Sequence, residues 1–409
     1  MQKGLIKKIA EKYNTPIYVY SEEILEKNAK NILNFPNAYS LTARYAMKAL
    51  PTKRILQIFN ELGLHIDASS FYEVERAINA GINPKNIQLT SQELPEEKIK
   101  YLIEIGVIIN ACSLRQLEDI GKNSQGINIS IRINPGIGSG NTQKVNVGGS
   151  LSSFGIWHGQ FEEIKNIINK YNLKITKLHT HIGSGNNPEI WKKVAQISLE
   201  LVKKFENVTT LNLGGGFKVD RMNPQNNTNI EECGNVIEEL FVKFNEETGR
   251  KLKLEIEPGT YLVANAGFII SKIIDIVKTD KFEFIKTDTG MTEITRPTLY
   301  AAQHPITIIP QDETQRKEKE YIFVGHCCES GDLLTPEENN PEIPKPRKIT
   351  EANIGDLILI GGAGAYCSGM STKNYNSFPE APEVLITKNN EIELIRQKQE
   401  LNQMIQNEK

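Results

Sequence analysis

The sequence predicts an α/β fold, a TIM (β/α)8 barrel over residues 25–262, followed by a C-terminal all-β domain over residues 263–409. Two observations predict it. Up to about residue 262, eight short apolar runs alternate with segments of helical spacing, which is typical of a barrel. Beyond that point the apolar runs follow one another with little helical periodicity, which indicates a Greek-key barrel or sandwich.

The elements follow in order along the chain. Pro51 and Pro95 stand at suitable helix starts. The N-terminal segment 1–24 is expected to join the β domain, whose short apolar runs include 268–277, 320–325, 356–361 and 383–387. Barrel strands are expected near 40–47, 64–67, 87–91, 107–112, 127–134, 174–181, 208–213 and 252–257, and helices near 51–62, 70–81, 95–105, 113–122, 160–171, 188–205 and 230–247.

Composition narrows the class of partner. The chain has 409 residues, 48 basic and 50 acidic, giving a net charge of −2, so no field favours nucleic acid or an anionic membrane. The first residues mix charges with apolar side chains, and no membrane-length apolar run follows, so we expect a cytoplasmic protein that binds small molecules. Five cysteines without zinc-type spacing predict free thiols and no metal site.

Polar residues and glycines stand at the C-terminal ends of predicted barrel strands, where such barrels place their chemistry. Lys48 follows an apolar strand and is expected to be a buried amine. Three glycines from Gly214 follow another strand and leave room for a phosphate, although three glycines are often only a turn. Glu257 precedes Pro-Gly, a turn that suits a ligand with a phosphate and a protonated ring nitrogen.

Histidines and the second domain offer further candidates. His179 and His181 share a strand face, but without an obvious acidic third ligand a metal site is not expected. His181 better suits contact with a ring and a phosphate. In the second domain Cys328 lies among polar residues and glycine, which predicts a loop thiol, and Tyr366 is a candidate for ligand contact.

Taken together, these segments resemble the fold-type III pyridoxal-phosphate decarboxylases, which share the alanine racemase-like barrel. The resemblance runs from about residue 15 to residue 396, and its motifs are specific as a set although each is weak alone. They are Tyr45-Ala46-Met47-Lys48, Asn134-Pro135-Gly136, His181-Ile182-Gly183-Ser184-Gly185, Gly214-Gly215-Gly216, Glu257-Pro258-Gly259, Arg296-Pro297-Thr298-Leu299-Tyr300, Cys328-Glu329-Ser330-Gly331-Asp332 and Gly364-Ala365-Tyr366.

The resemblance implies the cofactor pyridoxal 5'-phosphate and a role for each matching residue. Lys48 would bind it as a Schiff base, His181 would stack on its ring, and Glu257 would pair with its pyridine nitrogen. Asp67 would also lie at the cofactor. The phosphate would be held by neutral donors, namely Ser184, Gly215, Gly216, the turn of Gly259 and Thr260, and Tyr366.

The family reaction implies an amino-acid substrate, meso-diaminopimelate, converted to L-lysine and carbon dioxide. Cys328 would give a proton to the former α-carbon, from the partner subunit of a homodimer with shared active sites. Glu329 would accept the distal ammonium of the substrate. Arg296 and Tyr300 would bind its distal carboxylate, with Tyr366 also contacting the substrate.

Thr260 departs from the family pattern, which usually has arginine there to help bind the distal carboxylate. A charge-assisted hydrogen bond is worth roughly 1.5 to 3 kcal/mol, so its loss weakens binding by about ten- to a hundredfold unless another residue compensates. Ser153 replaces a frequent lysine, to which we attach little weight.

Three alternatives stay open. A decarboxylase of D-lysine or D-ornithine would explain Thr260 but leaves Arg296 and Tyr300 without a purpose. An alanine-racemase-like enzyme would share the barrel and Lys48, but Glu257 and the segment around Cys328 favour decarboxylation. A homologue without catalysis, which binds a partner or only holds the cofactor, would not need Lys48, Glu257 and Cys328 together.

Overall fold

The structure, a computed structural model, describes residues 2–136, 148–181 and 185–409. The chain divides into two compact units, each described below by itself. The barrel unit comprises Glu26–Val219 and Gln225–Leu262, and the sheet unit comprises Met1–Leu25, Asp220–Pro224 and Val263–Lys409.

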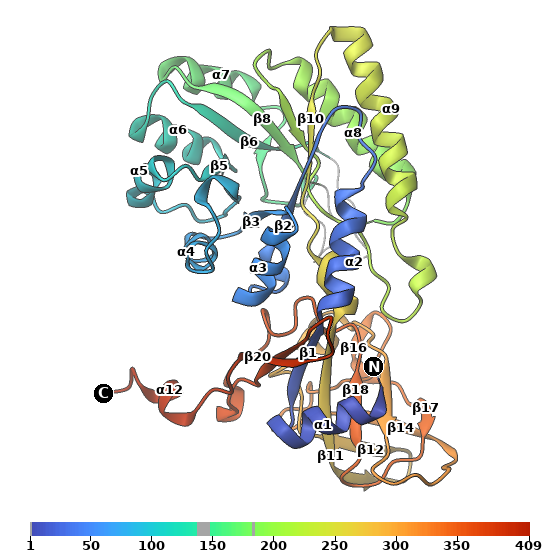
Figure 1. Ribbon diagram of the computed structural model, residues 1–409. Coiled ribbons are helices and arrows are strands. Elements are labelled where there is room, and N and C mark those ends of the chain that lie inside the picture. The colour runs from blue at the N-terminus through green and yellow to red at the C-terminus, as the bar shows by residue number, and fades with distance from the viewer. Residues whose placement is uncertain (1, 137–147, 182–184) are drawn as a thin grey trace. The chain divides into compact units, whose positions relative to one another are not determined.

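The predicted TIM barrel is confirmed (Figure 1). Each strand pairs in parallel with its neighbours, and the ring closes because β10 pairs with β2 while β5 pairs with β6. The described barrel strands are β2 (Leu41–Ala46), β3 (His65–Ala68), β4 (Ile87–Leu89), β5 (Ile108–Ala111), β6 (Asn128–Asn134), β8 (Lys174–Thr180), β9 (Thr210–Asn212) and β10 (Lys253–Ile256), with the short β7 (Ile156–Trp157) paired to β6.

Helices alternate with these strands, and their starts have local causes. The side chain of Ser70 accepts a hydrogen bond from the Glu73 backbone at the start of α4, and Ser113 does the same for α6. Pro188 occupies the first turn of α8, where a missing N–H costs nothing. The helices are α2 (Glu22–Leu33), α3 (Lys53–Glu61), α4 (Phe71–Asn79), α5 (Glu96–Glu104), α6 (Leu114–Asn123), α7 (Phe161–Lys170), α8 (Pro188–Lys203), α9 (Ile230–Thr248) and α10 (Thr260–Val263).

The sheet unit is a separate mixed β-sheet, so the second predicted domain is confirmed. Its strands pair both antiparallel, as β11 does with β12, and parallel, as β12 does with β14. The strands are β1 (Ile17–Ser21), β11 (Gly267–Lys278), β12 (Glu283–Thr287), β13 (Ile306–Ile309), β14 (Glu318–Val324), β17 (Arg347–Thr350), β18 (Leu357–Ile360), β19 (Glu383–Ile386) and β20 (Ile392–Arg396), with β15 (Pro336–Glu337) and β16 (Asn340–Pro344) forming a hairpin.

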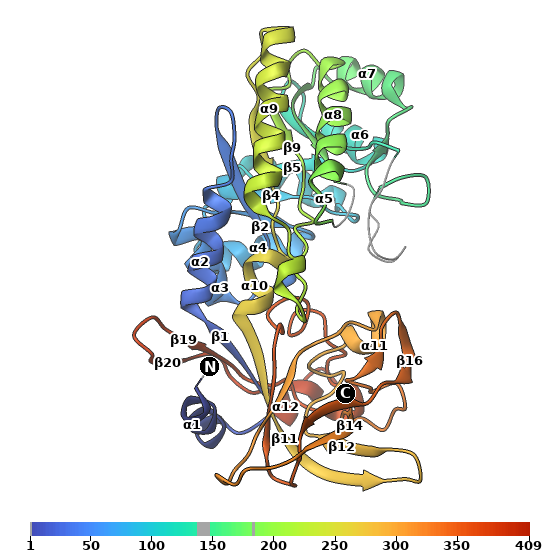
Figure 2. The same ribbon diagram turned by 90° about the vertical axis from the view of Figure 1, so that its right-hand side faces the viewer.

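The N-terminal segment is part of this sheet. Strand β1 lies between β11, which it pairs antiparallel, and β19, which it pairs in parallel. Helix α1 (Lys3–Tyr13) lies beside the sheet (Figure 2). Its Ile6 and Ile9 are fully buried in one apolar cluster with Ile270 and Val384. The short helices α11 (Arg296–Tyr300) and α12 (Leu401–Ile405) complete the unit.

None of the helices that the structure describes is long and apolar enough to span a membrane. The five cysteines are free thiols.

Candidate active site

The barrel unit brings the predicted strand-end residues to one rim. Lys48 follows β2, Asp67 lies in β3 and Glu257 follows β10, each at the C-terminal end of its strand. Burial raises the pKa of both carboxyls and the charge of Lys48 opposes the rise, which indicates that the three groups lie close together. The closed ring of strands therefore places an amine and two carboxyls at one mouth.

Glu257 is buried and held by neutral amides. Its Oε1 atom accepts hydrogen bonds from Gln88 Nε2 and Asn212 Nδ2, both at 2.7 Å. Its backbone N–H donates to the Gly214 carbonyl at 2.8 Å, which fixes the strand end. Two amide donors orient a carboxylate without neutralising it, so Glu257 keeps its capacity to attract a cation.

Burial also changes the titration of these carboxyls. It raises the pKa of Glu257, although Lys48 and Arg132 oppose the shift. Burial and then the charge of Glu257 raise the pKa of Asp67 to about 7, against the charge of Lys48 and a hydrogen bond from Thr90 at 3.0 Å. Two buried carboxyls that repel each other are stabilised by a protonated nitrogen between or beside them.

The expectation that Lys48 is a buried amine is wrong. Its neighbours Met47 and Ala49 are fully buried, but Lys48 itself is exposed. The reason is local: these residues form a 3-10 turn beyond β2, in which the two apolar residues are buried and the lysine is left exposed at the rim. An exposed amine at this position is within reach of a ligand that arrives from solvent.

His181 is oriented by the glycine segment. Its Nδ1 atom accepts the Gly215 N–H at 3.1 Å, and a Cβ atom on Gly214 would lie only 2.4 Å from that nitrogen. Gly214 also has a φ of +73°, which favours glycine. Burial and the charge of Arg132 lower the pKa of His181 well below its usual range. The His181 ring is therefore neutral and has a fixed orientation.

The Gly215 N–H is thus committed to His181, and a Cβ atom there would lie 2.3 Å from the Glu257 carbonyl oxygen. Gly216 accepts the Gly185 N–H at 3.0 Å. The glycines accordingly provide close approach of three strand ends, whether or not a phosphate also binds there. Ser184 lies outside the described residues.

His179 does not form a metal site with His181. Burial and the charge of Arg132 lower the pKa of His179 well below its usual range, so the 3.4 Å between its Nε2 atom and Glu257 Oε2 is not an ion pair. Its Nδ1 atom lies 2.6 Å from Asn110 Nδ2. Among residues 2–136, 148–181 and 185–409, no group of three His, Cys, Asp or Glu side chains is placed to bind a metal.

Sequence reasoning missed a polar network inside the barrel. Arg44 makes a two-point ion pair with Glu255 at 3.0 Å for each contact, and Lys177 Nζ lies 2.6 Å from the same carboxylate. Lys177 also donates to Gln88 at 3.1 Å, and Gln88 donates to Glu257. The chain of contacts links a cluster of two cations and one carboxylate to the Glu257 carboxylate at the mouth.

These residues share a signal that the sequence carries. Gln88, Lys177 and Asn212 are polar side chains within barrel strands, and all three are buried. Barrel interiors are usually filled by branched apolar residues, so a buried polar side chain in such a strand points into a functional network.

The turn after Glu257 is tightly packed. A Cβ atom on Gly259 would lie 3.2 Å from the Ala46 Cβ atom, and the Pro258 carbonyl accepts the Ala46 N–H at 3.1 Å. Thr260 begins the four-residue helix α10 and is half-buried. The turn therefore fastens the end of β10 to the end of β2, next to Lys48.

In the sheet unit, the segment with Cys328 is an exposed turn. The Cys328 N–H donates to Asn376 Oδ1 at 2.8 Å, and Glu329 accepts the Gly331 N–H at 3.1 Å. Burial and the charge of Asp332 raise the pKa of the neighbouring Cys327 to about 12. The two adjacent thiols thus differ, since Cys328 is exposed to solvent and Cys327 is half-buried.

The remaining predicted residues also belong to the sheet unit. Arg296 and Tyr300 are the first and last residues of α11, and the Arg296 guanidinium carbon lies 5.9 Å from the centre of the Tyr300 ring. Tyr366 is half-buried with a φ of +56°, a conformation rare outside glycine and asparagine. Such backbone strain is common at ligand-binding positions.

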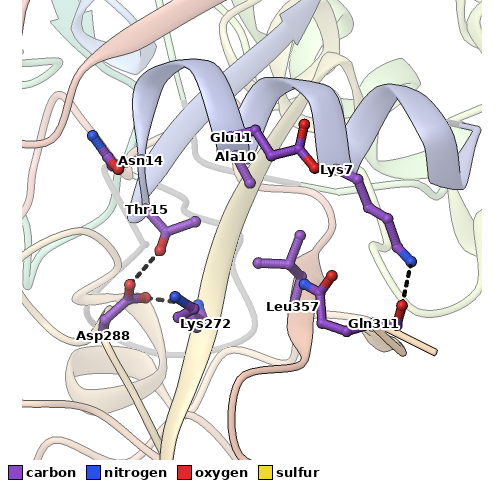
Figure 3. Close-up of a pocket in the computed structure, with 9 residues that line it drawn as sticks. All are labelled: Lys7, Ala10, Glu11, Asn14, Thr15, Lys272, Asp288, Gln311 and Leu357. Carbon is purple, nitrogen blue, oxygen red and sulfur yellow. Dashed lines mark hydrogen bonds between the residues drawn. The ribbon is translucent and has the colours of Figure 1, made fainter.

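A pocket of about 380 Å³ in the sheet unit lies apart from these residues (Figure 3). Asp288 in it accepts hydrogen bonds from Thr15 and from the Lys272 backbone, and Lys7 donates to the Gln311 carbonyl at 3.0 Å. No predicted site residue lines it, so it gives no support to the predicted chemistry. Its lining residues are Lys7, Ala10, Glu11, Asn14, Thr15, Lys272, Asp288, Gln311 and Leu357.

Comparison with known proteins agrees with this geometry. Residues 22–264 match the family described as pyridoxal-dependent decarboxylase, pyridoxal binding domain. The chain is 34% identical over 410 residues to the diaminopimelate decarboxylase of Buchnera aphidicola subsp. Acyrthosiphon pisum, covering 99% of this chain and 96% of that protein. It is 29% identical to the diaminopimelate decarboxylase of Escherichia coli K12, covering 97% and 94%.

Solved structures give the same result. A crystal structure of diaminopimelate decarboxylase superposes with a TM-score of 0.91 at 29% identity, covering 99% of this chain and 96% of that chain. The diaminopimelate decarboxylase of Helicobacter pylori complexed with L-lysine superposes with a TM-score of 0.85 at 25% identity, covering 98% of both. The cofactor is accordingly pyridoxal phosphate, and the chain belongs to the diaminopimelate decarboxylase family of pyridoxal-dependent decarboxylases.

Proposed function

We propose that the chain decarboxylates meso-diaminopimelate to L-lysine and carbon dioxide with pyridoxal phosphate as cofactor. One observation carries the proposal: the barrel unit places a buried carboxylate, Glu257, held by two amides, at the rim that also bears Lys48. The full-length similarity to diaminopimelate decarboxylases supplies the substrate.

The residues at the rim fit the cofactor. Glu257 and Asp67 are buried carboxyls with raised pKa values, so a pyridinium N–H would relieve their desolvation. The glycines at 214 and 215 remove the Cβ atoms that would fill this space. A neutral His181 with fixed orientation suits stacking on a flat ring.

Pyridoxal phosphate, when bound, supplies an electron sink for the pair released as carbon dioxide leaves. Glu257 would keep the ring nitrogen protonated, because a carboxylate favours the charged form of a neighbouring base. Lys48, an exposed residue at the rim, would hold the cofactor covalently through its Nζ atom. Ser184, Gly215, Gly216, Gly259, Thr260 and Tyr366 are the residues that we propose surround the phosphate.

Residues of the sheet unit would bind and protonate the substrate. Arg296 and Tyr300 hold the distal carboxylate, and Glu329 accepts the distal ammonium. Cys328, whose thiol is exposed and whose backbone is fixed by Asn376, gives its Sγ proton to the former α-carbon. We propose that Cys328 and Glu329 serve the active site of the partner subunit in a homodimer.

Thr260 favours a second candidate function, the decarboxylation of D-lysine or D-ornithine. Its hydroxyl gives one hydrogen bond but no charge, so it offers no ion pair to a distal carboxylate. Arg296 argues against this candidate, since neither substrate has a distal carboxylate for its guanidinium.

The substitution Lys48→Ala tests the proposal. Purified wild-type protein supplied with the cofactor should show the visible absorbance of a lysine-bound pyridoxal and release carbon dioxide and L-lysine from meso-diaminopimelate in equal amounts. Lys48→Ala should lose that absorbance and the turnover, because the covalent link needs the amine. Lys53→Ala, which removes an exposed lysine at the start of α3, is the control. An unchanged spectrum in Lys48→Ala would contradict the cofactor assignment.

A further inference from the structure

In the sheet unit, four described arginines have a buried N–H group without a hydrogen-bond partner. Two of them, Arg316 and Arg396, form ion pairs with carboxylates, and the other two have no such ion pair among the described residues. The donors of these other two are Nη2 of Arg221 and Nε of Arg296. Buried polar atoms are nearly always satisfied, and a charged donor left alone is costly. These two donors therefore require an explanation, and an anion that the protein binds is the simplest one.

Contacts within the sheet unit hold the Arg221 side chain in place. The residue belongs to Asp220–Pro224, a segment that leaves the barrel unit and packs with the sheet unit. Its Nε atom donates to the Gly362 carbonyl at 2.8 Å. A Cβ atom on Gly362 would lie 2.7 Å from Arg221 Cδ, and Gly362 has a φ of +64°, so the glycine makes room for this side chain.

Among the described residues, no ion pair joins a carboxylate to Arg221 or Arg296, although the charge of Asp220 partly opposes the lowering of the Arg221 pKa. The nearest acid in sequence, Asp220, accepts the N–H groups of Met222 and Asn223 at 3.0 Å each. Burial and then the charge of Arg296 lower the pKa of Arg221 to about 9. Two guanidinium groups that disfavour each other in a desolvated place are stabilised when an anion binds both.

We propose that Arg221 and Arg296 together bind the distal carboxylate of the substrate, and that Arg221 supplies the charge missing at Thr260. This inference rests on the proposed function. A purely structural role, fastening Asp220–Pro224 to the Gly362 carbonyl, explains the Nε contact but leaves the buried Nη2 atom without a purpose. A planar guanidinium matches the two oxygens of a carboxylate, and two of them surround it.

A pair of ligands that differ only in this carboxylate tests the inference. L-Lysine, the product, keeps the distal carboxylate, and pentane-1,5-diamine is the same molecule without it. Titration calorimetry of the cofactor-loaded protein should show that wild type prefers L-lysine. Arg221→Gln, which retains a donor for the Gly362 carbonyl, should weaken L-lysine binding by about ten- to a hundredfold and leave the diamine unchanged.

Two further variants separate charge from packing. Arg221→Lys keeps the charge but lacks the planar guanidinium. Its affinity for L-lysine should therefore lie between those of wild type and Arg221→Gln. Arg115→Met removes an exposed arginine of α6 and should change the affinity for neither ligand. If one variant fails to fold, the other still reports the ratio of the two affinities.

Three results would overturn the inference. The first is an unchanged ratio of affinities in both Arg221 variants. The second is equal weakening of both ligands, as a structural role predicts. The third is weaker cofactor binding, measured by visible absorbance, with the preference for L-lysine retained, which would assign Arg221 to the phosphate. A wild-type protein with no preference for L-lysine would instead contradict the proposed function itself.

Discussion

At the scale of single residues, the mouth of the barrel is defined by two carboxyls that share one desolvated space. Asp67 and Glu257 each have a raised pKa, for which burial is the main cause, and the charge of Lys48 partly offsets it. Gln88 and Asn212 hold Glu257 in place without neutralising it. The arrangement is unfavourable for the protein alone and favourable once a protonated nitrogen binds, which is how a cofactor site differs from a structural ion pair.

This arrangement predicts an unusual pH dependence of stability. With the pKa of Asp67 raised to about 7, the folded protein binds more protons than the unfolded chain between about pH 4 and pH 7. The free energy of unfolding that Asp67 contributes therefore falls as the pH rises through this window, and levels off above it. Asp67→Asn cannot titrate and keeps an acceptor for Thr90.

Urea denaturation of the cofactor-free protein from pH 4 to pH 8 measures the effect. The stability of Asp67→Asn relative to wild type should increase with pH by at most about 1.4 kcal/mol per pH unit. A difference between the two proteins that is the same at every pH would show that Asp67 titrates normally.

Single residues are also where sequence reasoning was weakest. Lys48 was expected to be buried, but a strand pattern cannot show which way a side chain turns once the strand has ended. Gln88 and Arg221 carry no motif, and their importance appears only when the partners they contact, or lack, are known. Glu257 was identifiable because it ends an alternating strand and precedes a Pro-Gly turn.

At the scale of elements, the eight barrel strands and seven of the helices were predictable within a few residues. Their apolar runs and helical spacing are long and regular enough to decide the type of element. The segment Asp220–Pro224 was not predictable, because it forms no long element and its place depends on packing far along the chain. The glycines after β9 were predictable as a close approach, but their role in orienting His181 was not.

The substitution Gly215→Ala tests whether this close approach is required. A Cβ atom there would meet the Glu257 carbonyl oxygen at 2.3 Å, so the ends of β9 and β10 must separate. We expect the free energy of unfolding to fall by about 1 to 3 kcal/mol and cofactor retention to fall with it.

Gly4→Ala is the matched control, because nothing lies within 4 Å of its Cβ position and the residue is in helix α1. It should leave stability unchanged or raise it by up to about 1 kcal/mol. Equal stability of Gly215→Ala and wild type in urea denaturation would show that the strand ends can yield at no cost.

At the scale of the whole molecule, the proposed chemistry is divided between the two units. The barrel unit contains Lys48 and Glu257, and the sheet unit contains Arg296 and Cys328. The sheet unit also contains Arg221, which lies in the segment Asp220–Pro224. The sequence predicted both units but not that this segment belongs to the sheet unit. The exposed turn of Cys328 suits a residue that acts on another subunit, in keeping with the homodimer with shared sites that the family resemblance implies.

Mixing two inactive variants tests the shared sites. Lys48→Ala and Cys328→Ala should each be inactive alone. If the partner subunit supplies Cys328, a mixed dimer has one site with both changes and one intact site, so a random mixture should recover about a quarter of wild-type activity. Recovery requires subunit exchange, which a mixture of differently tagged chains verifies by co-purification. Co-purified mixed dimers without activity would contradict shared sites.

Carbon dioxide release from meso-diaminopimelate, D-lysine and D-ornithine, measured in parallel on the cofactor-loaded protein, tests the central claim most directly. We expect the highest kcat/KM for meso-diaminopimelate, because two arginines in the sheet unit are available for its distal carboxylate despite Thr260. Faster turnover of either D-amino acid without that carboxylate would contradict the substrate that we propose.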